Sequence, residues 1–347
     1  MVGLLAAPEA CPDVFTFVVH DARMPAPRTL IVLGGGGALG AFQVGGLLAL
    51  AEAGIVPDAL FGSSAGALNA AFLASDPSVE RARQLADWWS DAESRRVLAP
   101  GRWTQLRGVA GAVASRADAL LDERPLRTLV STHVGAHDLS ELAVPLTVTT
   151  TCLDCSRARH HDRGPLADLL VASCSLPGLF PPVRMADGHA HVDGGVLCGV
   201  PLEAALAAAG PDDVVYVLDC ALAPVTGTTG TCAAVPHDGP TQACGLGATS
   251  ERWEPPVERR RGALDIVLRA FTVARAVANG LAVAPLLADP RVRVAPHVAD
   301  AWAVGALRRV PAGPRDFSST ASLVTAGRTS TAAWLQAARA VDPTSAV

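Results

Sequence analysis

The sequence contains no lysine, only one tyrosine and three methionines, and aromatic residues make up 4% of its 347 residues. All 28 positive charges are therefore arginines, against 33 acidic residues, and the formal net charge is -5. A chain without a basic excess has no field that would hold a phosphate backbone, so we expect no nucleic-acid partner. Hydrophobic residues make up 50% of the chain, which is enough for a substantial buried core.

Signals for membrane insertion or secretion are also missing. Residues 1–10 have no positive charge before their apolar residues, so we expect no signal peptide. Residues 29–51 carry no charge and are long enough to span a bilayer, but glycines crowd the stretch and weaken a helix. They predict a strand, a turn and a helix instead of a transmembrane segment. We expect a cytoplasmic protein that contacts membranes at most peripherally.

The eight cysteines are too few for a disulfide scaffold in a chain of this length. Cys152 and Cys155 form a single C-x-x-C, which is compatible with a redox pair or half of a zinc site. No second such pair accompanies it, and we interpret the nearby His160 and His161 as surface residues. The sequence therefore predicts no metal and no cofactor.

The first 75 residues contain two successive strand–turn–helix units. Residues 29–33 predict a buried strand, followed by four glycines and a helix over 38–53 that ends at Gly54. A second strand over 59–62 leads into a helix over 65–74. Such units predict a parallel sheet covered by helices.

Similar patterns continue to the end of the chain. We expect helices within 80–130 and over 166–173, 262–281 and 321–340, and strands over 146–152, 190–192, 214–219 and 292–295. Between residues 221 and 261 periodicity gives way to Thr, Gly and Pro, which indicates a long loop or lid. The whole is predicted to be one α/β domain.

Gly62, Ser63, Ser64, Ala65 and Gly66 form a G-x-S-x-G motif between a predicted strand and a predicted helix. The bare pattern is weak evidence, but in this context it is typical of a sharp turn that exposes a serine hydroxyl at a helix N-terminus. Ser64 is then a candidate nucleophile, with Gly62 and Gly66 as the glycines of the turn.

Gly34 to Gly37 form the other strand-to-helix turn. Consecutive glycine amides can point toward one atom, so Gly35, Gly36 and Gly37 are candidates for an oxyanion hole. In a doubly wound sheet this loop and Ser64 would face the same crevice. The loop also satisfies the dinucleotide fingerprint, with glycines at 35, 37 and 40. That alternative needs an acid at the end of the second strand, whereas Asp58 precedes it.

A nucleophilic serine needs a base. Asp193 follows a strand-like segment and precedes two glycines, so it is placed to take a proton directly from Ser64. His237 and His297 lie in the right chain order for a triad, but neither sits at a recognisable strand end.

With these motifs the chain resembles the patatin-like phospholipase family, in its bacterial branch. The resemblance is carried by residues 30–50, 61–71, 172–183 and 191–196, and more weakly by 201–206 and 316–335. It implies a three-layer α/β/α fold with a mainly parallel central sheet, and a Ser-Asp dyad without histidine that cleaves acyl esters of lipids. Ser64 and Asp193 match the dyad, and Gly35, Gly36 and Gly37 match the oxyanion loop.

The resemblance also implies domain limits and one departure. Residues 1–27 would be an extension without fixed structure, and 28–345 the acyl hydrolase domain. Many family members have an arginine where this chain has Leu39, which cannot bind a phosphate. A neutral ester, a lysolipid or a small acyl ester is therefore as consistent a substrate as a phospholipid.

The sequence thus favours a serine acyl hydrolase acting on lipid or carboxylic esters. Two alternatives remain open: a catalytically silent binding protein with the same fold, and a dinucleotide-binding protein. Trp88, Trp89, Trp103 and Leu98 are either a membrane-facing lid or buried helix packing. The oligomeric state is not indicated.

Overall fold

The computed structural model describes residues 26–91, 121–220, 263–303, 307 and 317–341. The predicted extension over 1–27, except for its last two residues, and the predicted loop over 221–261 lie outside these ranges, so the domain limits stay predictions. The strands are β1 (Thr29–Leu33), β2 (Ala59–Ser63), β3 (Leu146–Cys152), β4 (Arg157–His161), β5 (Val183–Arg184), β6 (Ala190–Asp193), β7 (Val214–Leu218) and β8 (Val292–Val294).

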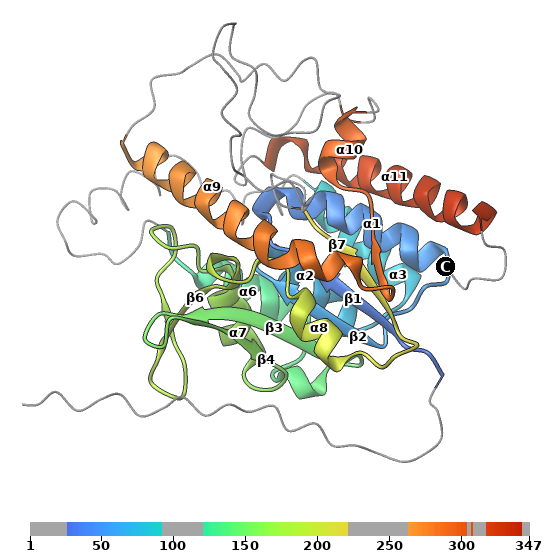
Figure 1. Ribbon diagram of the computed structural model, residues 1–347. Coiled ribbons are helices and arrows are strands. Elements are labelled where there is room, and N and C mark those ends of the chain that lie inside the picture. The colour runs from blue at the N-terminus through green and yellow to red at the C-terminus, as the bar shows by residue number, and fades with distance from the viewer. Residues whose placement is uncertain (1–25, 92–120, 221–262, 304–306, 308–316, 342–347) are drawn as a thin grey trace, which may run out of the picture.

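Helices and short 3-10 turns connect these strands (Figure 1). The α-helices are α1 (Gly40–Glu52), α2 (Ala65–Ala74), α3 (Val79–Ser90), α6 (Arg124–His133), α7 (Leu166–Cys174), α8 (Leu202–Ala208), α9 (Ala263–Val283), α10 (Val298–Ala303) and α11 (Thr320–Val341). The 3-10 turns are η1 (Gly37–Leu39), η2 (Leu139–Glu141), η3 (Gly194–Val196), η4 (Ala284–Ala288) and η5 (Phe317–Ser319).

The eight strands form one mixed sheet in the order β5-β6-β3-β2-β1-β7-β8, with β4 also paired to β3. Strands β3, β2, β1, β7 and β8 run parallel to one another. Strands β4, β5 and β6 make the antiparallel pairs. The predicted mainly parallel sheet between helices is confirmed.

The register around β3 brings two strand ends together. Strand β2 pairs with β3 as far as Ser63 opposite Thr149. Strand β6 runs the other way and ends with Asp193 opposite Thr150. Because β4 occupies the other edge of β3 over Val148 to Cys152, β2 and β6 share one edge and meet end to end. The residues that follow β2 and end β6 are thereby placed side by side.

The sheet is covered on both faces, as the alternation of β1 indicates. Ile31 and Leu33 pack in a large cluster with α1, α2, α3 and α11. Leu30 and Val32 belong to a second cluster with α8 and the end of α9. Side chains of a strand point alternately to its two faces, so these clusters are the two interfaces of a three-layer α/β/α architecture.

Helices α1 and α11 touch through their backbones. A Cβ atom on Gly45 would lie 2.1 Å from the Val324 carbonyl oxygen, and one on Gly327 would lie 2.0 Å from the Phe42 carbonyl oxygen. No side chain fits at either point, so the two glycines set the separation of the helices. The helix that follows the glycine loop is thereby held by the last helix described.

Most predicted elements are present, and the differences are local. The sequence analysis missed β4, β5, α8 and α10, all of which are short. The interpretation of His160 and His161 as surface residues is wrong: both are half-buried on β4 and bond to the hydroxyls of Thr149 and Thr150. Burial lowers the pKa of His161 to about 4.

The two tryptophans of α3 belong to the packing of helices. Trp89 is buried, stacks on Phe317 and donates its indole N–H to Asn69. Trp88 is half-buried and meets Trp89 edge to face. The membrane-facing lid interpretation is therefore wrong for Trp89, while Trp103 and Leu98 lie outside the described residues.

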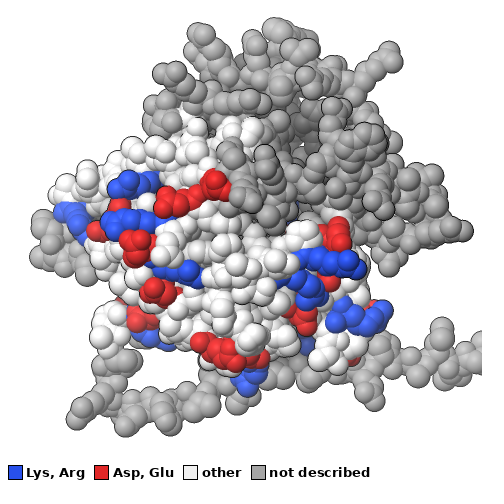
Figure 2. Space-filling model, turned by 180° about the vertical axis from the view of Figure 1, so that it is seen from behind, with Lys and Arg blue, Asp and Glu red and all other residues white. Residues whose placement is uncertain are grey.

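Among the described residues, none of the helices is both long enough and apolar enough to cross a bilayer. On the face of the molecule shown in Figure 2, arginine and acidic side chains are interspersed, and neither sign forms a continuous patch.

Candidate active site

Ser64 occupies a strained turn between β2 and α2. Its backbone angles are φ 53 and ψ -125, a conformation that L-residues rarely adopt. A Cβ on Gly66 would lie 2.2 Å from the Leu33 carbonyl oxygen, and one on Gly62 would lie 2.6 Å from the Cα of Ala67. Both predicted turn glycines are therefore required by close backbone approach.

The turn is supported from β3. The amide of Ser64 donates to the hydroxyl of Ser173 at 2.9 Å, and that hydroxyl donates to the Thr149 carbonyl at 2.7 Å. The Ser64 carbonyl accepts the amides of Ala67 and Leu68 in the first turn of α2. The strain at Ser64 is thus held in place by hydrogen bonds on both sides.

Ser64 and Asp193 are in direct contact. The Ser64 hydroxyl donates to Asp193 Oδ2 at 2.6 Å, while Asp193 Oδ1 accepts the Gly195 amide at 2.7 Å. Asp193 is 2% exposed and Ser64 is half-buried, so the pair is sheltered but open on the serine side. The two residues that the sequence singled out are brought together by the meeting of β2 and β6.

The electrostatics of Asp193 combine two opposing influences. Burial raises the pKa of its carboxyl group above the usual range, because the charged form loses its water. The guanidinium of Arg275, the Ser64 hydroxyl and the Gly195 amide each act in the opposite direction. The result is a carboxylate that is a stronger base than an exposed aspartate.

Cys174, at the end of α7, is a further neighbour of this pair. Burial raises the pKa of its thiol well above the usual range, the negative charge of Asp193 adds to this, and the hydrogen bond with Ser64 opposes it. The thiol is therefore neutral at ordinary pH and does not compete with Ser64 as a charged nucleophile.

The glycine loop lies against Ser64. A Cβ on Gly35 would lie 3.1 Å from the Cβ of Ser64, so the loop and the serine are in contact. The Gly35 amide already donates to the Gly199 carbonyl at 2.9 Å. Gly37 has a φ of 57, which turns the chain into η1. Leu39 is fully buried in the large core cluster.

A buried polar chain supports the loop from behind, and the sequence analysis missed it. Trp89 donates to Asn69 Oδ1 at 2.9 Å, and Asn69 Nδ2 donates to Gln43 Oε1 at 2.9 Å. Gln43 Nε2 in turn donates to the carbonyls of Gly34 and Leu218 at 3.1 and 2.8 Å. The only sequence signal was a pair of polar residues in otherwise apolar helices.

Helix α9 contributes two side chains that the sequence analysis also missed. Arg275 Nη1 lies 3.3 Å from Asp193 Oδ1, and the two side chains are 15% and 3% exposed. One turn later, Asn279 donates to the Gly195 carbonyl at 3.0 Å and accepts the Gly199 amide at 2.8 Å. Polar residues four positions apart on an apolar helix were the available signal.

The other candidates have structural roles or lie outside the described residues. His297 is buried at the start of α10, where its Nδ1 accepts the Ala299 amide. Asp58 accepts the Thr29 amide before β2, and β2 itself ends without the acid that a dinucleotide site requires. His237 lies outside the described residues.

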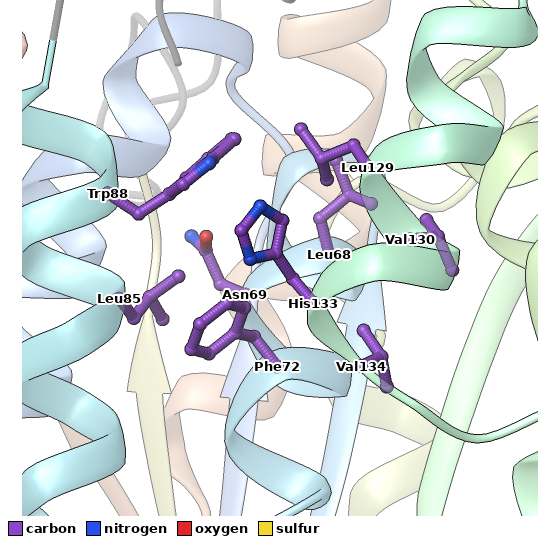
Figure 3. A pocket seen from close by; sticks show the side chains of 9 residues that line it. All are labelled: Leu68, Asn69, Phe72, Leu85, Trp88, Leu129, Val130, His133 and Val134. Carbon is purple, nitrogen blue, oxygen red and sulfur yellow. The ribbon is translucent and has the colours of Figure 1, made fainter. Parts of the chain in front are cut away.

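A small apolar pocket lies between α2, α3 and α6 (Figure 3). It contains neither Ser64 nor Asp193, but Leu68 in its wall stands one helical turn after Ser64. The rest of its lining is Asn69, Phe72, Leu85, Trp88, Leu129, Val130, His133 and Val134. Its walls are mainly hydrocarbon.

The strain at Ser64 yields a test of stability. Replacing Ser64 by glycine removes the unfavourable φ, while replacing it by alanine keeps it; both changes remove the bond to Asp193. Glycine also makes the unfolded chain more flexible, which reduces the gain in free energy of unfolding that comes from relieving the strained φ. We expect Ser64→Gly to exceed Ser64→Ala by about 1 kcal/mol in free energy of unfolding.

Urea unfolding of the two variants, followed by circular dichroism, measures this difference. Ser75, which follows α2 with a φ of -69, supplies the control pair. At position 75 the alanine variant should have the higher free energy of unfolding. If the alanine variant were also the more stable one at position 64, the turn would be unstrained.

Comparison with known proteins adds the family. The family model described as patatin-like phospholipase matches residues 31–206, about half of the chain. The chain is 33% identical over 172 residues to neuropathy target esterase sws of Drosophila sechellia, covering 49% of this chain and 11% of that protein. It is 31% identical over 196 residues to patatin-like phospholipase domain-containing protein 7 of Mus musculus, covering 56% and 14%. The chain thus spans a small part of these relatives.

Two solved structures are also similar. VipD from Legionella pneumophila has a TM-score of 0.42 at 15% identity, over 90% of this chain and 67% of that one. A chain of the SpcU–ExoU complex of Pseudomonas aeruginosa has a TM-score of 0.29 at 21% identity, over 45% and 40%. The expected bacterial branch is not supported, since the curated relatives named above come from a fruit fly and a mouse. The family itself is clear from the matched model: the chain belongs to the patatin-like phospholipase family.

Proposed function

We propose that this protein is a serine acyl hydrolase that cleaves lipid or other carboxylic esters with Ser64 and Asp193. The observation that carries the proposal is the 2.6 Å hydrogen bond from the Ser64 hydroxyl to the buried Asp193 carboxylate, at a strained turn. The family model and the names of the relatives, an esterase and a phospholipase domain protein, support an ester as substrate.

In the proposed mechanism, Asp193 removes the proton of the Ser64 hydroxyl as its oxygen attacks the ester carbonyl carbon. The bond to the leaving alcohol then breaks, and Asp193 returns the proton to that alcohol. Water attacks the acyl-enzyme by the same route, with Asp193 again accepting a proton. The carboxylic acid leaves and Ser64 regains its hydrogen.

The oxyanion of each tetrahedral intermediate needs amide donors. The three glycines of the loop over 35–37 differ in whether their amides are available for this. Because the Gly35 amide is engaged with the Gly199 carbonyl, we assign the oxyanion hole to the amides of Gly36 and Gly37. Gly35 remains necessary as the point where the loop packs against Ser64. These steps require no metal or cofactor.

The dyad is tested by a fluorophosphonate probe and by hydrolysis of p-nitrophenyl esters of short and long acids. We expect Ser64→Ala and Asp193→Asn to be folded but to lose labelling and at least about 10²-fold in rate, because nucleophile and base are removed. Ser63→Ala is the matched control. Its hydroxyl is buried without a hydrogen-bond partner, so this variant should label and turn over like the wild type.

Two outcomes would contradict the proposal. A folded wild type that neither labels nor hydrolyses any ester would favour the silent binding protein. Labelling that persists in Ser64→Ala would place the nucleophile elsewhere.

Arg275 provides a test by pH. Its positive charge lowers the pKa of Asp193, and the base must be deprotonated to act. Removing the charge in Arg275→Gln raises the pKa of Asp193. When the pH is lowered, the variant should therefore lose activity at a higher pH than the wild type does. We expect the acid limb of kcat/KM to move up by about 1 pH unit.

Arg275→Lys keeps the cation and should leave the limb near its original position. A limb that stays in place in Arg275→Gln would mean that Asp193 is not the group that titrates, even if kcat falls.

We further propose that the enzyme works at a lipid surface. Ile266, Val273, Val277 and Leu281 are between 43% and 56% exposed and share one side of α9 by their spacing. Arg275 and Asn279 point the other way, to the segment after Asp193. Helix α9 therefore combines an apolar outer face with the active site, as expected of an element that meets lipid.

This face is tested with phosphatidylcholine vesicles. The double variant Val273→Asp, Val277→Asp should lose vesicle flotation and about tenfold in hydrolysis of vesicle lipid, because two exposed valines that would enter the lipid are exchanged for charges. Its hydrolysis of a short soluble ester should be unchanged. The equally exposed Val294→Asp on β8 is the control. Equal binding by the double variant and the wild type would refute a role for α9.

A further inference from the structure

Two cysteines and a histidine come together at the far end of β3, where the sequence analysis expected no metal. Cys152 is the last residue of β3, and Cys155 lies in the turn to β4. His189 comes from a different hairpin, between β5 and β6. Their ligand atoms all lie within 4.8 Å of one another.

The three donor atoms face a common point. The two Sγ atoms are 3.1 Å apart, and His189 Nδ1 lies 3.6 Å from Cys152 Sγ and 3.3 Å from Cys155 Sγ. Neither cysteine is joined in a disulfide. Zinc bonds of about 2.3 Å in a tetrahedral site hold two sulfurs about 3.8 Å apart, so a shift of less than about 1 Å would admit the ion.

The surroundings are built to hold these ligands in place. The Cys155 amide donates to Cys152 Sγ at 3.2 Å, which fixes the position of that sulfur. Asp187 Oδ1 accepts the His189 amide at 2.9 Å, and its Oδ2 lies 3.6 Å from the Nδ1 that faces the sulfurs. An oxygen donor is thus available at the edge of the cluster. Two thiolates and an imidazole are ligands that zinc prefers.

The two hairpins are already joined next to the cluster. Asp154 Oδ2 accepts the Ala190 amide at 2.6 Å, and the Leu153 amide donates to the Ala190 carbonyl at 2.9 Å. The cluster therefore forms on a rigid junction and does not depend on a flexible tail. An ion at this point would tie the β3–β4 turn to the start of β6, the strand that ends at Asp193.

We propose that Cys152, Cys155 and His189 form a structural zinc site that fastens β6 to β3. The ion lies at the opposite end of β6 from Asp193 and takes no part in acyl transfer. The proposal is independent of the proposed hydrolase activity, because it rests on ligand geometry alone. A histidine from a separate hairpin supplies a third ligand beside the C-x-x-C.

The experiment measures metal in the full chain, purified without an affinity tag and without added metal. We expect about one zinc per chain by elemental analysis, and a Co²⁺ titration with the thiolate-to-cobalt charge-transfer band of a tetrahedral site. Removal of zinc by a chelator should lower Tm by about 5 °C, and zinc alone should restore it.

Cys152→Ser, Cys155→Ser and His189→Ala should each lose the charge-transfer band or the stoichiometric zinc. Cys198→Ser and the exposed His137→Ala are matched controls and should keep both. Circular dichroism identifies any variant that fails to fold, and the chelation of the wild type tests the site without mutation.

Three results would overturn the proposal. The first is a wild type that binds neither zinc nor cobalt. The second is full stoichiometry in all three ligand variants. The third is a Cys152–Cys155 disulfide in protein purified without reductant, which would make the pair a redox couple.

Discussion

The structure depends on one shared edge: β2 and β6 approach each other head-on along the same side of β3. Since the other side of β3 is filled by β4, neither strand can slide past the other. Their ends place a serine in a forced turn against a carboxylate that has almost no access to water. The contact between Ser64 and Asp193 follows from strand register, and a change of one residue in the pairing of β6 would turn Asp193 to the opposite face of the sheet.

The rest of the site is organised around this meeting point from two directions. From within the helical layer, the chain of hydrogen bonds from Trp89 through Asn69 to Gln43 holds the carbonyl side of the glycine loop. From the other direction, Arg275 of α9 contacts Asp193, and Asn279 of the same helix binds the carbonyl of Gly195. Loop, serine and carboxylate are each supported by a different element, and rigid support of this kind is what electrostatic preorganisation requires.

Local patterns in the sequence were sufficient for the regular elements and for the motif residues. The apolar runs before Gly34 and Gly62 predict β1 and β2 because buried parallel strands are apolar throughout. What could not be read was long-range register. Nothing near Asp193 indicates that its strand pairs antiparallel with β3, and nothing near Arg275 indicates its target. The engagement of the Gly35 amide by Gly199 depends on how two distant loops pack. Likewise, His189 lies in a different hairpin from Cys152 and Cys155. Ligands from two separate turns form no motif that can be recognised along the sequence.

The close contact between α1 and α11 has a consequence for how the protein is made. Ser64 and Asp193 leave the ribosome well before α11, yet α1 has its glycine surface covered only when Gly327 arrives to pack on Phe42. Strand β1 likewise gains its second neighbour only with β7. A nascent chain that already carries every motif residue therefore still has an open sheet edge and an uncovered helix. The part of the molecule that holds Ser64 and Asp193 is thus finished by α11, a helix that is synthesised later and contributes no residue to that pair.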